Sequence, residues 1–161
     1  MKVLAETLRF RPMRRSDLEA VARLEQAAHP FPWSREQILD SLRAGHAMWL
    51  CCQEQSGGEK AEVLGYGVLS WVLDEASLLT LAVAPRRQGR GIGRALLNFL
   101  LAQAREQDMT RVFLEVRESN SRAILLYESS GFALVGRRRG YYPGERGRED
   151  ALLYAWNCRP A

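Results

Sequence analysis

The chain has 161 residues, of which 47% are hydrophobic and 26% are charged, a composition typical of one globular domain. Apolar runs stay well short of the roughly 20 residues that a membrane-spanning helix needs, and the first residues carry no signal-peptide pattern. The net charge of +4 leaves nucleic acid, the ribosome or an anionic small ligand as candidate partners, besides a merely solvated basic face. We therefore expect a single cytoplasmic domain over residues 1–161 with no membrane partner.

The cysteines and histidines predict no metal site. Cys51, Cys52 and Cys158 form a sparse and odd set, which favours reduced thiols in a cytosol-like compartment. No Cys/His pair has the spacing of metal ligands. His29 and His46 are isolated in or near predicted loops, where surface or packing roles are expected.

Hydrophobic periodicity predicts strands and helices along the whole chain. Strands are expected, in chain order, at residues 7–13, 47–53, 62–73, 78–83, 110–116, 132–139 and 148–157. Helices are expected at residues 17–28, 35–44, 91–107 and 122–130. The resulting order, β-α-α-β-β-β-α-β-α-β-β, predicts an α+β fold with a mixed, mostly antiparallel sheet.

Capping residues mark the ends of these helices. Ser16–Glu19 and Ser34–Gln37 have the spacing of capping boxes at the starts of the first two helices. Ser119–Ser121 is expected to cap the last helix, while Gly45 and Gly131 are expected to end helices in the left-handed conformation.

Two segments combine proline with aromatic residues. His29–Trp33 follows the first helix, and Tyr141–Gly144 is predicted to be a loop between the last two strands. A third connection, Asp74–Ala76, is predicted to be the turn between two long strands. Loops on a rigid sheet often carry specificity, so the two aromatic segments are candidates for a binding site.

A basic, glycine-rich stretch separates the strand ending at Val83 from the long helix that follows. Glycines alternate at positions 89, 91 and 93, and four arginines crowd the same turn: Arg86, Arg87, Arg90 and Arg94. A helix start presents unpaired N–H groups and the positive end of the macrodipole, and glycines let a ligand approach the backbone. The stretch predicts an anion site, most naturally for phosphate; a turn with solvated arginines is the alternative.

Two familiar phosphate motifs do not fit this stretch. A P-loop needs Gly-Lys-Ser/Thr, which does not follow Gly93, and the dinucleotide fingerprint fails at Arg94 or Leu96. Residues Gln88–Gly93 do fit Gln/Arg-x-x-Gly-x-Gly/Ala. The stretch therefore resembles the pyrophosphate loop of the GCN5-related N-acetyltransferases, the GNAT family, and the order of elements is also that of the GNAT fold.

Separate segments resemble one branch of that family, the RimI-type N-terminal acetyltransferases, which act on the N-terminal alanine of a small-subunit ribosomal protein. The matching segments are, in chain order, Phe31–Ser34, Leu114–Arg117 with Asn120, Leu126–Glu128 with Gly131–Phe132, Arg139–Pro143 and Arg148–Ala151. The resemblance covers nearly the whole chain. It implies acetyl-coenzyme A as co-substrate, no metal, a protein N-terminus as partner, no direct contact with nucleic acid, and a monomer.

The resemblance implies a role for two ionisable residues. Glu115 is the candidate base, since a carboxylate in an apolar strand is costly to bury unpaired; an ion pair with an arginine such as Arg117 is the alternative. Tyr127 is the candidate acid, whose phenol would protonate the departing thiolate; a buried aromatic is the alternative.

The resemblance also implies which residues bind the two substrates. The strand before the loop is expected to carry a bulge and to offer the Val83 N–H as an oxyanion-type donor. The expected coenzyme contacts are Leu81, Ala82, Val83, Gln88, Gly89, Arg90, Gly91, Ile92, Gly93, Arg94 and Asn120. The expected peptide contacts are Phe31, Trp33, Tyr141 and Tyr142. Helix capping alone is the alternative for Asn120, and packing or simple exposure is the alternative for the aromatic residues.

An α-amine is the chemically easier acceptor. The pKa of an unperturbed α-amino group is about 7.7–8.0, against about 10.4 for lysine, so deprotonation near neutral pH costs several kcal/mol less. A modest base, acting directly or through water, then suffices. Two rival functions remain: a GNAT enzyme acting on lysine side chains or a small amine, and a non-catalytic module that binds acetyl-coenzyme A or the ribosome.

Overall fold

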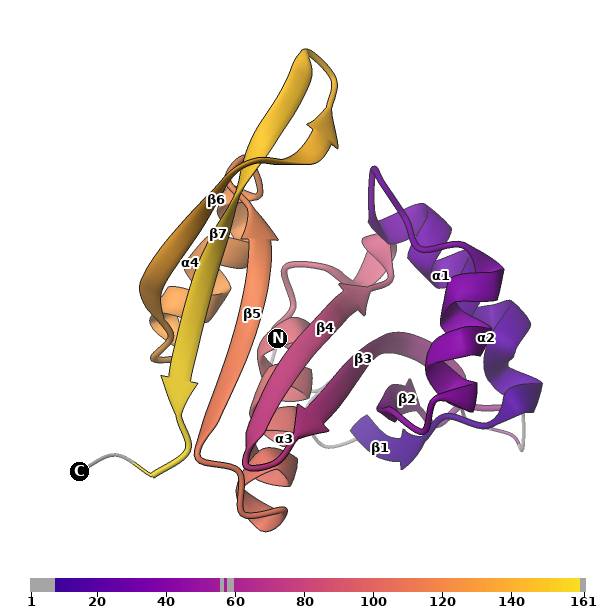
Figure 1. The fold of residues 1–161 in the computed structure, drawn as a ribbon. Helices are drawn as coiled ribbons and strands as arrows, with labels where there is room; N and C mark the ends of the chain where they lie inside the picture. Colours follow the sequence, from indigo (N-terminus) through magenta and orange to yellow (C-terminus); the bar gives the residue numbers. More distant parts are fainter. Residues whose placement is uncertain (1–7, 56, 58–59, 160–161) are drawn as a thin grey trace. The chain divides into compact units, whose positions relative to one another are not determined.

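The computed structural model describes residues 8–159 apart from residues 56, 58 and 59 (Figure 1). Over these residues the strands and helices follow the predicted order. The strands are β1 (Leu8–Pro12), β2 (Ala47–Gln53), β3 (Glu62–Val72), β4 (Glu75–Val83), β5 (Arg111–Arg117), β6 (Ala133–Gly144) and β7 (Gly147–Asn157). The helices are α1 (Leu18–Ala28), α2 (Arg35–Arg43), α3 (Ile92–Glu106) and α4 (Ser121–Ser129), with 3₁₀ turns η2 (Arg15–Asp17) and η3 (Pro85–Arg87).

These strands form one sheet whose hydrogen-bonded order is β1-β2-β3-β4-β5-β7-β6. The pairs β1–β2, β2–β3, β5–β7 and β6–β7 are antiparallel, whereas β4–β5 is parallel. The parallel register runs from Glu75↔Arg111 to Leu78↔Leu114. The predicted α+β architecture with a mixed, mostly antiparallel sheet is therefore confirmed.

The chain forms two compact parts, which are described separately. The first part contains residues 8–70 and 80–100, and the second contains residues 71–79 and 101–159. The first therefore carries the glycine-rich loop and the His29–Trp33 segment. The second carries β5, α4 and the β6–β7 hairpin.

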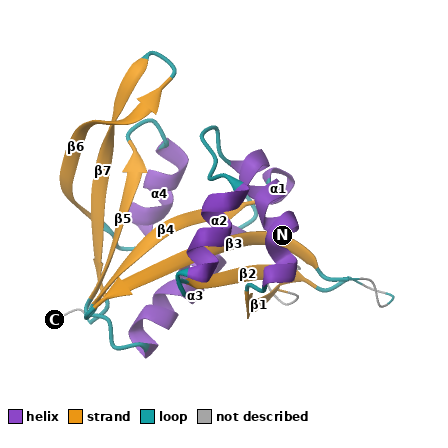
Figure 2. Cartoon of the chain, turned by 45° about the vertical axis from the view of Figure 1, so that its right-hand side comes forward, coloured by secondary structure: helices purple, strands orange, loops and turns teal. Residues whose placement is uncertain are grey.

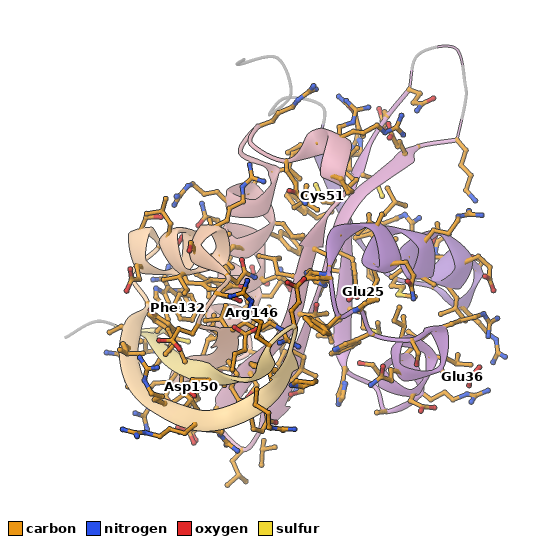
Figure 3. All side chains as sticks on the ribbon, turned by 90° about the horizontal axis from the view of Figure 1, so that it is seen from above. Glu25, Glu36, Cys51, Phe132, Arg146 and Asp150 are labelled. Carbon is orange, nitrogen blue, oxygen red and sulfur yellow. The ribbon has the colours of Figure 1, made fainter. Side chains whose placement is uncertain are left out.

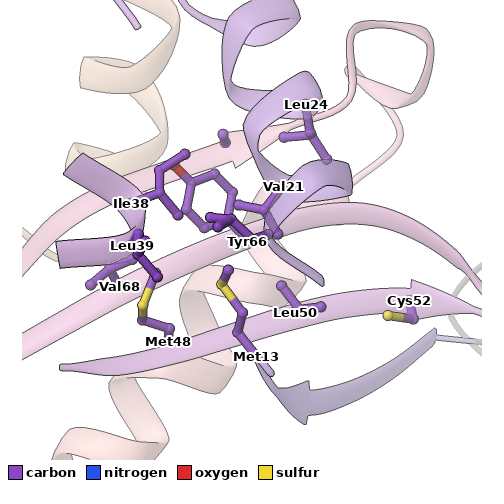
Figure 4. Close-up of a cluster of buried hydrophobic side chains, with 12 residues drawn as sticks. Met13, Val21, Leu24, Ile38, Leu39, Met48, Leu50, Cys52, Tyr66 and Val68 are labelled. Carbon is purple, nitrogen blue, oxygen red and sulfur yellow. The ribbon is translucent and has the colours of Figure 1, made fainter. Parts of the chain in front are cut away.

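In the first part, α1 and α2 cover one face of β2 and β3, and α3 covers the other (Figure 2). The core under α1 and α2 includes buried side chains from five elements (Figure 4): Val21, Leu24, Ile38, Leu39, Met48, Leu50, Tyr66, Val68 and Ala82. On the opposite face, Phe99 of α3 stacks on Phe10 at 4.5 Å and meets Trp49 edge-on at 4.8 Å. The two faces together fix α1, α2 and α3 on the strands they cover.

In the second part, β5 alternates between a buried and a half-exposed face. Val112, Leu114 and Val116 are buried, while Glu115 and Arg117 lie on the half-exposed face. This period of two is the expected side-chain alternation of a strand. It places the candidate base on the face of β5 that is not packed in the core.

Most of the predicted helix ends are confirmed. Ser34 and Gln37 form the predicted capping box, in which the Ser34 N–H donates to Gln37 Oε1 at 2.7 Å and the Gln37 N–H donates to Ser34 Oγ at 3.1 Å. Gly45 and Gly131 follow α2 and α4 with φ values of +79° and +99°, the left-handed conformation that glycine adopts readily.

The capping box predicted at Ser16 and Glu19 is wrong. Helix α1 begins at Leu18, directly after η2. The Asp17 carboxylate accepts the Arg14 N–H at 2.8 Å and pairs with Arg11 at 2.8 Å. The N-cap of η2 is thus Arg14, with Asp17 as the acidic residue three positions later, and Asp17 rather than Ser16 is the N-cap of α1.

The loop predicted at Tyr141–Gly144 is also wrong, because these residues are the end of β6. The register pairs Tyr142 with Glu149 and Pro143 with Arg148, after an irregularity between Arg138 and Tyr142. Gly140 has a φ of +59° inside that irregularity. β6 lies at the edge of the sheet, where a proline is tolerated although it lacks an N–H. Neither Pro143 nor the bulge therefore ends the strand.

The turn between β3 and β4 lies at Leu73 and Asp74, slightly earlier than predicted, since β4 already begins at Glu75. Cys51, Cys52 and Cys158 are free and buried.

Candidate active site

The glycine-rich loop has a backbone that only glycine adopts easily. Gly89 and Gly91 have φ values of +77° and +84°, in the left-handed region that costs other residues about 1–2 kcal/mol. The Gln88 side-chain amide donates to the Val83 carbonyl at 3.0 Å and ties the loop to the end of β4. The loop is thus an ordered turn between β4 and α3, held by glycine conformations and by a side-chain hydrogen bond.

The start of α3 has the form of an anion cradle. Helix α3 begins at Ile92, which is buried, and its first N–H groups lack partners within the helix. Nothing lies within 4 Å of a Cβ placed on Gly91, so the space in front of the helix is open. Acetyl-coenzyme A carries a pyrophosphate that such a cradle fits, and the residues Gln88–Arg94 would hold it.

The arginines of the loop do not all serve the same purpose. Arg87 forms an ion pair with Glu62 of β3 at 2.7 Å, with both side chains about a quarter exposed. This contact anchors η3 to the sheet. Arg86 and Arg90 are exposed to solvent beside the glycines, which leaves them in position to meet an anionic ligand.

The end of β4 lies very close to β3 at a glycine. A Cβ built on Gly65 would stand 2.7 Å from the Ala82 carbonyl oxygen, so a side chain there would collide with the β4 backbone. The Ala84 N–H donates to the Leu64 carbonyl at 2.8 Å. These contacts fix the backbone of the residues expected to face the acetyl arm; the bulge expected in this strand remains a prediction.

The two aromatic residues of the His29–Trp33 segment behave differently. Phe31 has 42% of its surface exposed. Trp33 is half-buried and packs against the core under α1 and α2, which agrees with the packing alternative considered for it. Phe31 is thus the side chain of this pair that a peptide can reach.

Glu25 fixes this segment, a role that the sequence analysis did not assign to it. Its carboxylate is fully buried on α1 (Figure 3) and accepts the Tyr66 hydroxyl at 2.6 Å and the Trp33 N–H at 3.0 Å. His29 Nδ1 lies 2.7 Å from the same carboxylate. Burial alone would raise the pKa of Glu25, but the contacts with His29, Tyr66 and Trp33 hold it below the usual range.

In the second part, the Glu115 side chain is 29% exposed, and its partner is Arg138. The Arg138 Nε lies 3.3 Å from Glu115 Oε1. Arg117, the partner considered from the sequence, instead bonds Glu149 Oε1 and the Pro143 carbonyl, each at 2.7 Å. The candidate base is thus a partly exposed carboxylate that forms an ion pair with one exposed arginine.

Tyr127 lies inside the second part with 8% of its surface exposed. Its ring meets Phe132 edge-on at a centroid distance of 5.7 Å. Burial, and to a smaller extent the nearby Tyr142, raises the pKa of the Tyr127 phenol well above its usual range. Burial thus further favours the protonated phenol, the form that a general acid needs before it acts.

Tyr141 and Tyr142 contact two arginines, one of which, Arg138, also pairs with the candidate base Glu115. The two rings meet edge-on at 5.0 Å, Arg117 lies 4.4 Å from the Tyr142 ring, and Arg138 lies 5.3 Å from the Tyr141 ring. Burial raises the pKa of Tyr142, with a further contribution from the negative charge of Glu115. The end of β6 thus places both aromatic residues beside the half-exposed face of β5.

Asn120 caps α4, as its sequence context predicted. Its Oδ1 accepts the Ala123 N–H at 3.2 Å. A contact with the coenzyme remains a prediction for this residue. Asp150 has a comparable structural role at the bulge of β6 (Figure 3), since it accepts the Gly140 N–H at 2.9 Å and pairs with Arg137 at 2.8 Å.

A family model described as the acetyltransferase (GNAT) family matches residues 18–132. The chain belongs to the GNAT acetyltransferase family. Among curated GNAT relatives, the [ribosomal protein bS18]-alanine N-acetyltransferase of Escherichia coli K12 is 41% identical over 140 residues, which cover 87% of this chain and 90% of that protein. The corresponding Haemophilus influenzae enzyme is 37% identical, over 86% and 91% of the two chains.

Solved structures agree with this assignment. The crystal structure of the ribosomal-protein-S18-alanine N-acetyltransferase from Escherichia coli matches with a TM-score of 0.85 and 36% identity, covering 96% of each chain. The GNAT fold expected from the order of elements is therefore confirmed, together with acetyl-coenzyme A as the co-substrate of this family.

The described residues contain neither a membrane-spanning helix nor a metal centre. None of the helices described is long and apolar enough to cross a membrane. Within the same residues, no group of three or more His, Cys, Asp or Glu side chains is arranged to hold a metal ion.

Proposed function

We propose that the protein transfers acetyl from acetyl-coenzyme A to the N-terminal α-amine of a small-subunit ribosomal protein, namely the N-terminal alanine of bS18. In this proposal residues 1–161 work as one GNAT domain, as a monomer in the cytoplasm, with a protein N-terminus rather than nucleic acid as partner. The observation that carries it is the 41% identity to a bS18-alanine N-acetyltransferase over 87% of the chain.

The coenzyme supplies an acetyl thioester, and the first part of the chain is proposed to bind it. The N–H groups at the start of α3 and the open backbone at Gly91 would hold the pyrophosphate. The backbone of Leu81–Val83, fixed by its close approach to Gly65, would orient the acetyl arm. The Val83 N–H would donate a hydrogen bond to the thioester oxygen as charge develops there.

The second part of the chain is proposed to handle the protons. Glu115, half-exposed on β5, would take the proton of the α-ammonium group directly or through one water. Tyr127, whose protonated phenol is further favoured by burial, would give a proton to the departing thiolate. General acids and bases of this kind contribute roughly 10²–10⁴-fold to a rate.

The aromatic residues are proposed to recognise the peptide. Phe31 from the first part and Tyr141 from the second are both exposed, and Tyr142 rests on Arg117. Flat, rigid side chains of this kind bind an extended peptide at a small cost in conformational entropy.

The proposal is tested with acetyl-coenzyme A and three peptides. The first has the bS18 N-terminal sequence with a free alanine, the second is the same peptide with a blocked N-terminus and an internal lysine, and the third begins with a free proline. The expected result is fast acetylation of the first peptide only. Acetylation confined to the blocked lysine peptide would replace the proposed substrate by a lysine side chain, and binding of the coenzyme without any transfer would favour the non-catalytic module.

A further inference from the structure

We propose that the buried Glu25 carboxylate is a positioning residue for the peptide substrate, because it fixes both ends of the His29–Trp33 segment to helix α1. This inference rests on the proposed function, in which Phe31 contacts the peptide. Glu25 lies at the helical spacing of the apolar residues Leu18 and Val21, but the sequence analysis assigned it no role.

The burial of Glu25 demands an explanation. The carboxylate is completely buried, on a helix whose other buried residues are apolar. Burying a charged group costs free energy unless it is paired and hydrogen-bonded. Glu25 meets this condition through His29, whose pKa is raised by this contact, and through two further donors, the Tyr66 hydroxyl and the Trp33 N–H.

The three partners of Glu25 come from two segments, β3 and the two ends of the His29–Trp33 segment. Oε1 accepts the hydroxyl of Tyr66 on β3 at 2.6 Å, while Oε2 accepts the Trp33 N–H at 3.0 Å and lies 2.7 Å from His29 Nδ1. One oxygen thus faces the sheet, and the other faces both ends of the His29–Trp33 segment. Tyr66 itself lies in the core beside Ile38 and Val21 (Figure 4).

His29 extends the connection to β4. Burial alone would lower the pKa of His29, but its contact with Glu25 and a hydrogen bond to the Leu81 backbone raise the pKa above the usual value. His29 therefore contacts both the Glu25 carboxylate and the backbone of Leu81. Leu81 belongs to the strand segment proposed to orient the acetyl arm.

Phe31 lies between the two anchored positions. His29 is fixed through its side chain and Trp33 through its backbone N–H, both to Oε2 of Glu25. The intervening residues include two prolines, Pro30 and Pro32, which restrict the backbone further. The exposed Phe31 is therefore presented from a segment fixed at both ends, and a binding group that is already ordered loses less entropy when the peptide binds.

The test compares three variants: Glu25→Gln, His29→Gln and Tyr66→Phe. The first two disturb the oxygen that faces the segment, and the third removes only the bond on the other oxygen. We expect KM for the alanine peptide to rise about tenfold in Glu25→Gln and His29→Gln, the order of magnitude for loss of a charge-assisted hydrogen bond. We expect it to stay within about twofold of wild type in Tyr66→Phe, while KM for acetyl-coenzyme A changes less than about twofold in all three.

Stability measurements separate positioning from simple destabilisation. Tyr66→Phe loses a buried hydrogen bond, so its melting temperature should fall, although its peptide KM should not rise. Amide hydrogen exchange of the free protein should show faster exchange at Trp33 in Glu25→Gln than in Tyr66→Phe. A peptide KM that follows the melting temperature across all three variants would overturn the positioning role, whereas wild-type inactivity on the alanine peptide would overturn the proposed function itself.

Discussion

A matched pair of glycines on β3 tests how strictly the end of β4 is positioned. A Cβ on Gly65 would stand 2.7 Å from the Ala82 carbonyl oxygen, and a Cβ on Gly67 would stand 2.4 Å from Leu100 Cδ1. Neither glycine has a positive φ, so backbone strain does not contribute. The difference is that the Ala82 carbonyl is part of the β4 backbone, whereas the Leu100 methyl group is the end of a flexible side chain.

The expected magnitudes follow from this difference. Overpacking costs about 1–3 kcal/mol, and replacing a strand glycine by alanine returns about 0.5–1 kcal/mol. For Gly65→Ala we expect the upper end, a net loss of about 2 kcal/mol and a fall in melting temperature of about 4–8 °C. For Gly67→Ala we expect a smaller net loss of about 1 kcal/mol, because the close contacts are the side-chain ends of Leu100 and, at 3.3 Å, Leu81, which can shift more easily than backbone.

The two variants should also differ in activity. Movement of β4 displaces the proposed acetyl-arm residues, and a misplacement of about 1 Å can cost about 10²-fold in rate. We expect kcat/KM for acetyl-coenzyme A to fall by about 10–100-fold in Gly65→Ala and by less than about threefold in Gly67→Ala. Equal melting temperatures and equal rates for the two variants would refute this positioning of β4.

Three further predictions concern the proposed catalytic and positioning residues. Glu115→Gln should lower kcat/KM for the alanine peptide by about 10²-fold at pH 7 and by less at pH 9, where more of the amine is already neutral; an equal loss at both pH values, measured by steady-state rates, would contradict a base. Tyr127→Phe should lower kcat by about 10²-fold with the affinity for acetyl-coenzyme A unchanged by calorimetry; weaker coenzyme binding at an unchanged kcat would contradict an acid. The fold lowers the pKa of Glu25 and raises that of His29 from their unfolded values of 4.5 and 6.5. Their ion pair therefore stabilises the fold most between these two pH values. This stability is lost as the pH rises through the folded pKa of His29 or falls through that of Glu25. Denaturant unfolding of wild type and Glu25→Gln from pH 4 to 9 should show the largest difference in that window, and a constant difference would contradict the pairing.

Local sequence signals predicted the parts of the fold that depend on near neighbours. The Ser34–Gln37 capping box and the Asn120 cap bond residues three positions apart, so their partners could be seen in the sequence. The same reasoning failed at Ser16, because the arginine on β1 that pairs with Asp17 at 2.8 Å is brought there by the fold. The competing partner, not the capping rule, decided that helix start.

The candidate site shows the same limit. The glycine-rich loop could be predicted because the φ values of Gly89 and Gly91 require glycine. The ion pair of Glu115 with Arg138 could not, because the sequence favoured Arg117, which instead bonds Glu149 and Pro143 of the hairpin. The extension of β6 through Tyr142 depends on pairing with β7, and pairing between strands is not visible in the local pattern.

Glu25 is the clearest case of a residue that the sequence hides. Its partner Tyr66 lies 41 positions away, and the hydrogen bond between them is buried. Only the packing of α1 on β3 turns a helix carboxylate into an anchor for the neighbouring aromatic segment. Long-range contacts of this kind carry the positioning of the proposed site, whereas the local motifs indicate its chemistry.

The most direct test of the proposed function is the position of the acetyl group within a single peptide. A peptide with a free N-terminal alanine and an internal lysine is incubated with the protein and acetyl-coenzyme A, and the product is sequenced by tandem mass spectrometry. We predict that the acetyl group is found on the alanine α-amine and that the lysine remains free. Acetylation of the lysine with a free alanine would contradict the proposed function.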